Sequence, residues 1–218
     1  MSKVCRSWIL VAFVPIVGSF AAPVHAQSSF ELTPLFAYYQ PIGNFGPRTR
    51  EYFSTLPTNA SDLSGAAWGA EARVWIDRRL GAQLQAAVAN GIDILKNAIF
   101  TPGGTVEGPT QAQVLVATAQ ALYDLAPSAA DYRFLVSAGP SMVRHGGNAY
   151  APWGSPVNVG GALGIAVDLP VGPRLRLTLG AESLLYSLHI NDSQTKNSVE
   201  DGVQDDLLLH VGLVWRVR

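Results

Sequence analysis

The side chains able to do catalytic chemistry are few, and the most suggestive set is Ser187, His189 and Glu182. A hydrolase of this type needs a nucleophile, a base and an acid within reach of one another. In an extended strand, side chains alternate between faces, so Ser187 and His189 lie opposite Glu182 unless a bulge intervenes. A set without matching geometry is weak support for catalysis. We therefore expect a protein that is not an enzyme and that holds no cofactor.

A second group of reactive side chains is acidic and lies in the segment NDSQTKNSVEDGVQDD, residues 191–206. Carboxylates are the ligands that hard divalent cations prefer, but the spacing does not match an EF-hand, and acidic loops are commonly only solvated. We predict no resident metal and keep the segment as a candidate cation or partner site. Its residues are Asp192, Glu200, Asp201, Asp205 and Asp206.

A third group contains charges of both signs at positions that the strand pattern below turns to one interior. Opposite charges placed together offset part of the desolvation cost of each. We expect Glu71 and Glu182 to pair with arginines of this set. The predicted interior charge network is Glu71, Arg73, Arg133, Asp168, Arg176, Glu182 and Arg216.

The elements that carry these residues show alternation of period two, which is typical of strands with two different faces. In 157–169, odd positions are mostly large and apolar, and even positions are small or polar. Pro34 predicts a bulge or an unpaired position, and a change of phase between Gln113 and Thr118 predicts a bulge near 115–117. The eight predicted strands are 30–40, 66–77, 80–90, 110–125, 132–142, 157–169, 174–190 and 206–218.

The connections between these strands alternate in length. Long polar connections are expected at about 41–64, 91–109, 143–156 and 191–205, and short ones at 77–79, 126–130 and 170–173. Long loops on one side and tight turns on the other are typical of outer-membrane barrels.

The first residues have the layout of an export signal. Lys3 and Arg6 precede the apolar run Trp8–Phe20, and Val24 and Ala26 precede a predicted cut before Gln27. The alternative, a membrane anchor, is disfavoured because this run is shorter than the about 20 residues that a spanning helix needs. We expect residues 1–26 to be a signal peptide and residues 27–218 to be one barrel domain.

Removal of the signal changes the composition. Cys5 is the only cysteine, so the mature chain is expected to have no disulfide and no thiolate site. Thirteen basic and 16 acidic residues remain, a net charge of 13 − 16 = −3. That balance disfavours nucleic acid as a partner, because binding phosphate backbones needs basic excess.

A soluble β-sandwich or a lipocalin-like barrel is the alternative to a membrane barrel. The strands are longer than the usual ~5–6 residues of soluble sheets, and aromatic residues, which favour membrane interfaces, gather near strand ends. These aromatic residues are Tyr38, Tyr39, Trp75, Tyr123, Tyr132, Trp153, Tyr186 and Trp215. The pattern therefore predicts an all-β fold, an eight-stranded antiparallel up-and-down transmembrane β-barrel.

The final strand, LLLHVGLVWRVR, alternates like the C-terminal assembly signal of the OmpA/OmpX-like eight-stranded outer-membrane barrels, and the chain resembles that family. The family usually ends in Phe, whereas this chain ends in Arg218. The resemblance implies an outer-membrane location among outer-membrane lipid, both termini in the periplasm, and recognition of the last strand by the barrel-assembly machinery. We expect the barrel domain alone, without a peptidoglycan-binding domain.

For function, this resemblance together with a charged, filled lumen predicts a structural or surface-interaction role through four long extracellular loops, which are the candidate surface for a partner. The alternatives are a narrow pore or a lateral conduit for small molecules, and then a lipid-modifying enzyme such as some barrels of this type are.

Overall fold

The computed structural model describes residues 29–42, 64–95, 99–101, 104–106, 110–126, 132–147, 155–191 and 198–217. The predicted signal peptide and its cut before Gln27 lie outside these residues. Within the described ranges, no helix has the length and apolarity needed to cross a membrane.

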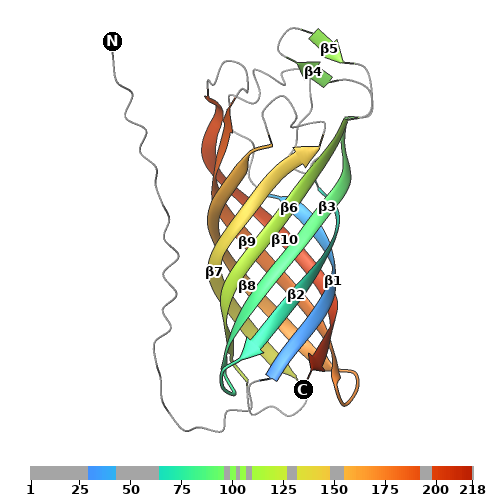
Figure 1. Cartoon of the computed structure of the whole chain (residues 1–218), viewed down its shortest axis with the longest axis vertical. Helices are drawn as coiled ribbons and strands as arrows, with labels where there is room; N and C mark the ends of the chain where they lie inside the picture. The colour runs from blue at the N-terminus through green and yellow to red at the C-terminus, as the bar shows by residue number, and fades with distance from the viewer. Residues whose placement is uncertain are drawn as a thin grey trace, which may run out of the picture.

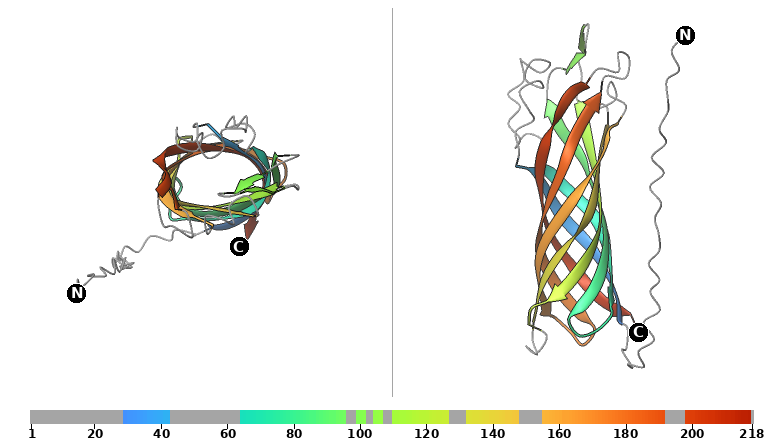
Figure 2. Two further views of the ribbon diagram at one scale, coloured as in Figure 1. Left: turned by 90° about the horizontal axis from the view of Figure 1, so that it is seen from above. Right: turned by 90° about the vertical axis from the view of Figure 1, so that its left-hand side faces the viewer.

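Eight long strands close into one antiparallel barrel in the order β1-β10-β9-β8-β7-β6-β3-β2 (Figures 1 and 2). This confirms the predicted fold class. A separate two-stranded sheet, β4 with β5, was not predicted from the sequence. The strands are β1 (Ser29–Pro41), β2 (Gly65–Trp75), β3 (Leu80–Leu95), β4 (Ile99–Thr101), β5 (Gly104–Val106), β6 (Thr110–Asp124), β7 (Arg133–Gly147), β8 (Val157–Pro170), β9 (Leu175–Asn191) and β10 (Ser198–Val217).

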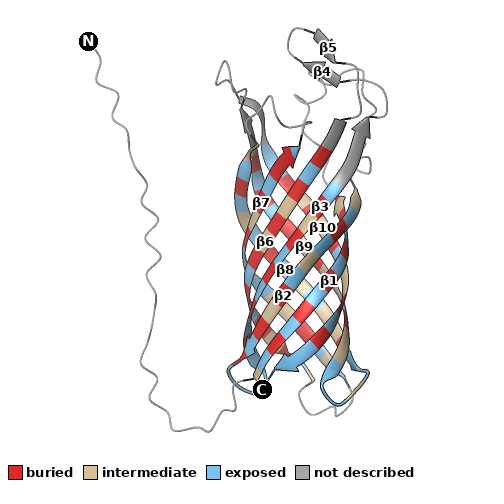
Figure 3. Cartoon of the chain, turned by 45° about the vertical axis from the view of Figure 1, so that its right-hand side comes forward, coloured by how far each residue is buried: buried red, intermediate tan, exposed pale blue. Residues whose placement is uncertain are grey.

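Buried and exposed residues alternate along each barrel strand, and Figure 3 shows the resulting bands. Large apolar side chains cover the outside: Val159, Leu163 and Ile165 of β8 are 69%, 58% and 65% exposed. A continuous apolar surface of this kind is rare on soluble monomers. It suits hydrocarbon, which also explains the closure, because every backbone group must find its partner within the sheet.

The barrel has two different ends. The short connections 76–79, 125–132 and 171–174, with the start of β1 and the end of β10, lie at what we call the turn end. The opposite, loop end carries 42–64, 96–109, 148–156 and 192–197. At the turn end, backbone N–H groups of Leu80 and Arg79 donate to the Asp77 carboxylate at 2.7 and 2.6 Å, and these bonds lower the pKa of Asp77.

Two details of the predicted strands are wrong. No bulge occurs near 115–117, because β6 pairs with β3 without a shift from Val114 to Tyr123, and the irregularity lies between Ala89 and Ile92 instead. Gln113 therefore points outward, and its amide donates to the Asn90 side chain. The inward positions above Thr118 are the small apolar Ala112, Val114 and Val116, which local alternation of polarity did not reveal.

The last connection is also shorter than expected. The sequence predicted a loop over 191–205, but β9 extends to Asn191 and β10 begins at Ser198. Asp205 and Asp206 are thus paired strand residues, opposite Leu185 and Leu184. With only 192–197 between these strands, the predicted strict alternation of long and short connections fails at its last member.

The strand ladder is interrupted at two prolines. Pairing of β1 with β10 skips from Leu32 to Leu35 around Pro34. Pairing of β6 with β7 skips from Ser141 to Ala138 around Pro140. Both gaps keep their register, so each proline removes a donor without inserting a residue. The sequence predicted either a bulge or an unpaired position at Pro34. The structure shows an unpaired position, on the side that faces β10. We call these gaps the Pro34 seam and the Pro140 seam.

A lumen-facing glycine allows close approach of the two strands at each seam. A Cβ atom on Gly212 would lie 2.7 Å from the Pro34 carbonyl oxygen. One on Gly139 would collide with the carbonyl oxygen of Ala119. Backbone atoms cannot move aside as a flexible side chain can, so only glycine fits these two positions.

We predict that Leu163→Arg destabilises the barrel by about 2–4 kcal/mol, because Leu163 lies midway along a strand facing the apolar surroundings. Urea unfolding in phosphatidylcholine vesicles, followed by the gel mobility of unheated samples, measures this change. The matched control is Val171→Arg, which alters a similarly exposed apolar residue (57% against 58%) in a turn. Equal losses for the two variants would contradict a membrane-embedded outer face.

Candidate functional site

The lumen is the candidate site, and its centre is Arg73 of β2. Its Nε lies 2.5 Å from Glu71 Oε1, and its Nη1 lies 2.8 Å from Asp168 Oδ2 on β8. Its Nη2 donates to the Thr178 hydroxyl on β9 at 3.5 Å. All three charged side chains have no solvent exposure. The arginine therefore spans the barrel and ties β2 to two strands that are not its neighbours.

Closer to the turn end, a second cluster forms around Glu31 of β1. The Trp75 indole N–H donates to its carboxylate at 2.8 Å, and Arg133 Nη1 does so at 2.9 Å. The Arg133 guanidinium also covers the Trp75 ring, 4.8 Å from its centroid, and Arg216 Nη2 lies 3.5 Å from the same carboxylate. The structure thus brings Arg133 and Arg216 to Glu31 and not to Glu71 or Glu182.

Glu31 was not among the residues of the predicted charge network. The signal was available in the strand order, since Glu31 is paired across β1 with Arg216 on one side and Arg73 on the other. Trp75, grouped with the interfacial aromatics, is instead buried in the lumen at 5% exposure. Its alternation with Arg73 on the same face of β2 already indicated this.

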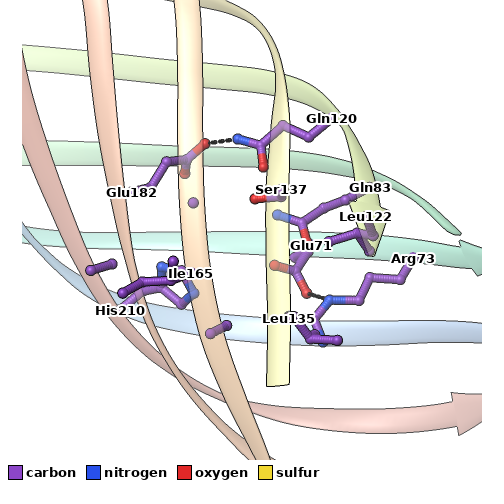
Figure 4. Close-up of a pocket in the computed structure, with 13 residues that line it drawn as sticks. Glu71, Arg73, Gln83, Gln120, Leu122, Leu135, Ser137, Ile165, Glu182 and His210 are labelled. Atoms are coloured by element: carbon purple, nitrogen blue, oxygen red, sulfur yellow. Dashed lines mark hydrogen bonds and ion pairs between the residues drawn. The ribbon is translucent and has the colours of Figure 1, made fainter. Parts of the chain in front are cut away.

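Glu182 of β9 does not pair with an arginine, contrary to the expectation. Its carboxylate accepts hydrogen bonds from the amides of Gln85, at 2.9 Å, and of Gln120 (Figure 4). A small cavity separates this carboxylate from the Arg73 cluster, and Ser137 and His210 also line it. Neither ring nitrogen of His210 has a hydrogen-bond partner among the described residues.

The loop-end half of the lumen is lined mainly by apolar side chains, which the sequence did not predict. Its inward side chains are Ala37, Ala67, Ala87, Ala89, Ala112, Val114, Val116, Val143, Ala162, Leu184, Leu188 and Leu208, all buried. They pack into one cluster with Tyr39 and Tyr186. Small and branched side chains of this kind fill an eight-stranded barrel without leaving an open channel.

Among the residues that the structure describes, one carboxylate, that of Asp206, lies within this mainly apolar half. The hydroxyls of Tyr39 and Tyr186 donate to its Oδ2 at 2.5 and 2.6 Å, and the Gln204 amide donates to Oδ1 at 2.9 Å. Tyr39 and Tyr186 were expected among the interfacial aromatics, but both are buried here. Hydrogen bonds from three donors compensate for the loss of water around the charge.

The candidate cation or partner site in the acidic segment is therefore corrected. Asp206 is wholly buried in the lumen, and Asp205 faces outward with its carboxylate accepting the Ser183 hydroxyl at 2.8 Å. Neighbouring strand residues point to opposite faces, so these two cannot share a ligand. Glu200 and Asp201 belong to β10, but their side chains, like Asp192, lie outside the described residues.

The structure separates two members of the predicted catalytic set. Ser187 is exposed on the outer face and Glu182 is buried inside, as strand alternation predicted. The His189 side chain lies outside the described residues. No cluster of three or more His, Cys, Asp or Glu side chains suited to a metal occurs among the described residues.

No protein-family model matches this chain, and no curated protein matches it. Solved structures do. Neisserial surface protein A is 14% identical, and the match covers 86% of this chain and 97% of that protein's chain, with a TM-score of 0.53. Outer membrane protein OprG from Pseudomonas aeruginosa is 12% identical over 89% and 98%, with a TM-score of 0.54. Outer Membrane Protein W of E. coli is 14% identical over 89% and 100%, with a TM-score of 0.52. The likeness confirms the predicted resemblance at the level of the fold.

We predict that Arg73→Met destabilises the folded barrel by about 3–5 kcal/mol, because it leaves Glu71 and Asp168 as buried charges without their cation. The measurement is urea unfolding in phosphatidylcholine vesicles. The control is Arg216→Gln, whose side chain is 45% exposed and whose loss should cost less than about 1 kcal/mol. Similar losses for both variants would show that Arg73 does not hold the lumen together.

Proposed function

We propose that this chain, which has the fold of the eight-stranded outer-membrane β-barrels, is a closed barrel that acts through the surface at its loop end and not as an open channel. The observation that carries this proposal is the unexposed Arg73, joined to Glu71 beside it and to Asp168 across the lumen. A side chain that spans the interior, with packed apolar residues above it, leaves no continuous aqueous path.

Three features support closure independently. The Glu31 cluster fills the turn end of the lumen with a tryptophan and two arginines. Glu182 and its two glutamines occupy the middle. The apolar cluster, with Asp206 held by two tyrosines, fills the loop-end half. In the first two layers, the contacts of Glu31 with Arg133 and of Glu182 with its glutamines join strands that do not pair, so they stiffen the barrel as well as filling it.

The loop end is then the part left to meet other molecules. In the outer membrane we place it outside the cell and the turn end, with both termini, in the periplasm, following the general arrangement of such barrels. The lipid-facing bands take up the sides, and the last strand would be the segment that the assembly machinery recognises.

The two other roles considered for the chain have less support. A narrow pore conflicts with the filled layers. A lateral conduit has one favourable feature, the Pro140 seam beside the cavity residue Gln120, but that cavity is small and is lined by charged side chains such as Glu71, Arg73 and Glu182.

We expect the wild-type barrel to show no steady conductance in a planar phosphatidylcholine bilayer. The triple variant Glu71→Ala/Arg73→Ala/Asp168→Ala removes the central charges together, so it leaves none unpaired, and should increase channel events. Leu163→Ala, altered on the outer face, is the matched control and should stay closed. Steady wild-type openings would overturn the proposal in favour of the narrow pore.

We also expect an epitope inserted in 192–197 to bind its antibody on intact cells, because this connection lies at the loop end. The same epitope inserted in 171–174, at the turn end, should bind only after the outer membrane is permeabilised. Both insertions must retain the faster gel mobility of an unheated barrel. The reverse labelling pattern would invert the orientation.

A further inference from the structure

Among the described residues, the mouth of the lumen at the turn end holds more cationic than anionic side chains. We call Glu31, Arg133, Arg176 and Arg216 the mouth cluster. Glu31 is its one carboxylate, and Arg133 and Arg216 both approach the same oxygen, at 2.9 and 3.5 Å. The Glu31 carboxylate also accepts the Trp75 indole N–H. Its acceptor capacity is thus already shared among three donors from three strands.

The neighbouring carboxylates are engaged elsewhere. Asp168 and Glu71 both contact Arg73, deeper in the lumen. Asp124 is buried at the same end, where its carboxylate accepts the backbone N–H of Ala126 at 2.9 Å and its charge acts on Arg79. The mouth cluster therefore keeps three guanidinium groups against one carboxylate of its own.

Arg176 of β9 is the member without a partner. Its Nη1 is buried and has no hydrogen-bond partner among the described residues. Arg133 and Arg216 both contact Glu31 in the same cluster, so Arg176 shares this mouth with two other cations. A buried donor left unmade is costly, and more so when it is charged. None of the described acceptors bonds to this nitrogen, and Asp168 Oδ1 is also left without a hydrogen-bond partner.

We propose that the mouth cluster is a binding site for an oxyanion of the phosphate class, held chiefly by Arg176 and Arg216. The planar guanidinium presents paired N–H donors that match phosphate oxygens. Arg216 is 45% exposed, so the site opens at the turn end, where both free phosphate and the headgroup of an anionic lipid have access. The site does not depend on what binds at the loop end.

Nε–Hε resonances of arginine, recorded by NMR on the full refolded barrel labelled with ¹⁵N-arginine, test this site. Inorganic phosphate is titrated in a zwitterionic detergent in one arm. In the other, vesicles of phosphatidylcholine are compared with vesicles that also contain phosphatidylglycerol. We expect saturable shifts of the Arg176 and Arg216 signals. Shifts with phosphate identify a free anion, and shifts only with phosphatidylglycerol identify a lipid headgroup.

The variant Arg176→Gln should raise the apparent dissociation constant measured from the Arg216 signal by about tenfold or more. This is the effect expected from the loss of one charge-assisted hydrogen bond. Arg78→Gln, on an exposed turn at the same end, is the matched control and should leave this constant unchanged. If Arg176→Gln does not fold, Arg216→Gln is read through the Arg176 signal instead. Unsaturable shifts, shifts lost equally in the control, or none in either arm would overturn the site.

Discussion

Hydrocarbon offers no hydrogen-bond partner to a peptide group, and this constraint decides most of what the barrel looks like. Every strand must have a neighbour on both sides, so the sheet closes. Closure separates an outer face, with Val159, Leu163 and Ile165 in contact with the apolar surroundings, from an interior that side chains must fill. Two of the interruptions in the ladder are at prolines, where the donor is absent from the chain itself.

The interior meets the same constraint with charges in place of backbone groups. A charged side chain shielded from water needs a partner, and Arg73 obtains two, one on its own strand and one across the lumen. Glu182 uses neutral amides and Asp206 uses tyrosine hydroxyls. The contacts are therefore graded along the axis, from ion pairs at the turn end to an apolar cluster crossed by one hydrogen-bonded carboxylate at the loop end.

Much of this architecture could be predicted from the alternation of apolar and polar residues, and the errors show where that pattern fails. Val157–Leu169 is readable because one face is large and apolar while the other is small or polar. In β6, inward Ala112 and Val114 resemble outward residues, so the phase was misjudged. In β9 and β10, Leu184 and Leu208 face inward beside outward Leu185 and Leu209, which hid how far the strands extend. Alternation assigns a face but not a partner. Glu182 meets Gln85 and Gln120 because of the stagger of strands around the ring, which no local pattern contains.

The two proline seams divide the ring evenly. Strands β1, β2, β3 and β6 lie on one side of them and β7, β8, β9 and β10 on the other. Each group is an uninterrupted stretch of the chain, Ser29–Asp124 and Arg133–Val217. The barrel is thus built from two sequential four-stranded meanders that meet along the two edges interrupted at prolines, and Arg73 reaches from the first meander to Asp168 in the second. If the chain were cut between 125 and 132, each fragment would keep the strand pairings among its own four strands. The two fragments would then have to meet at the two proline seams, and the buried pair of Arg73 and Asp168 would join them.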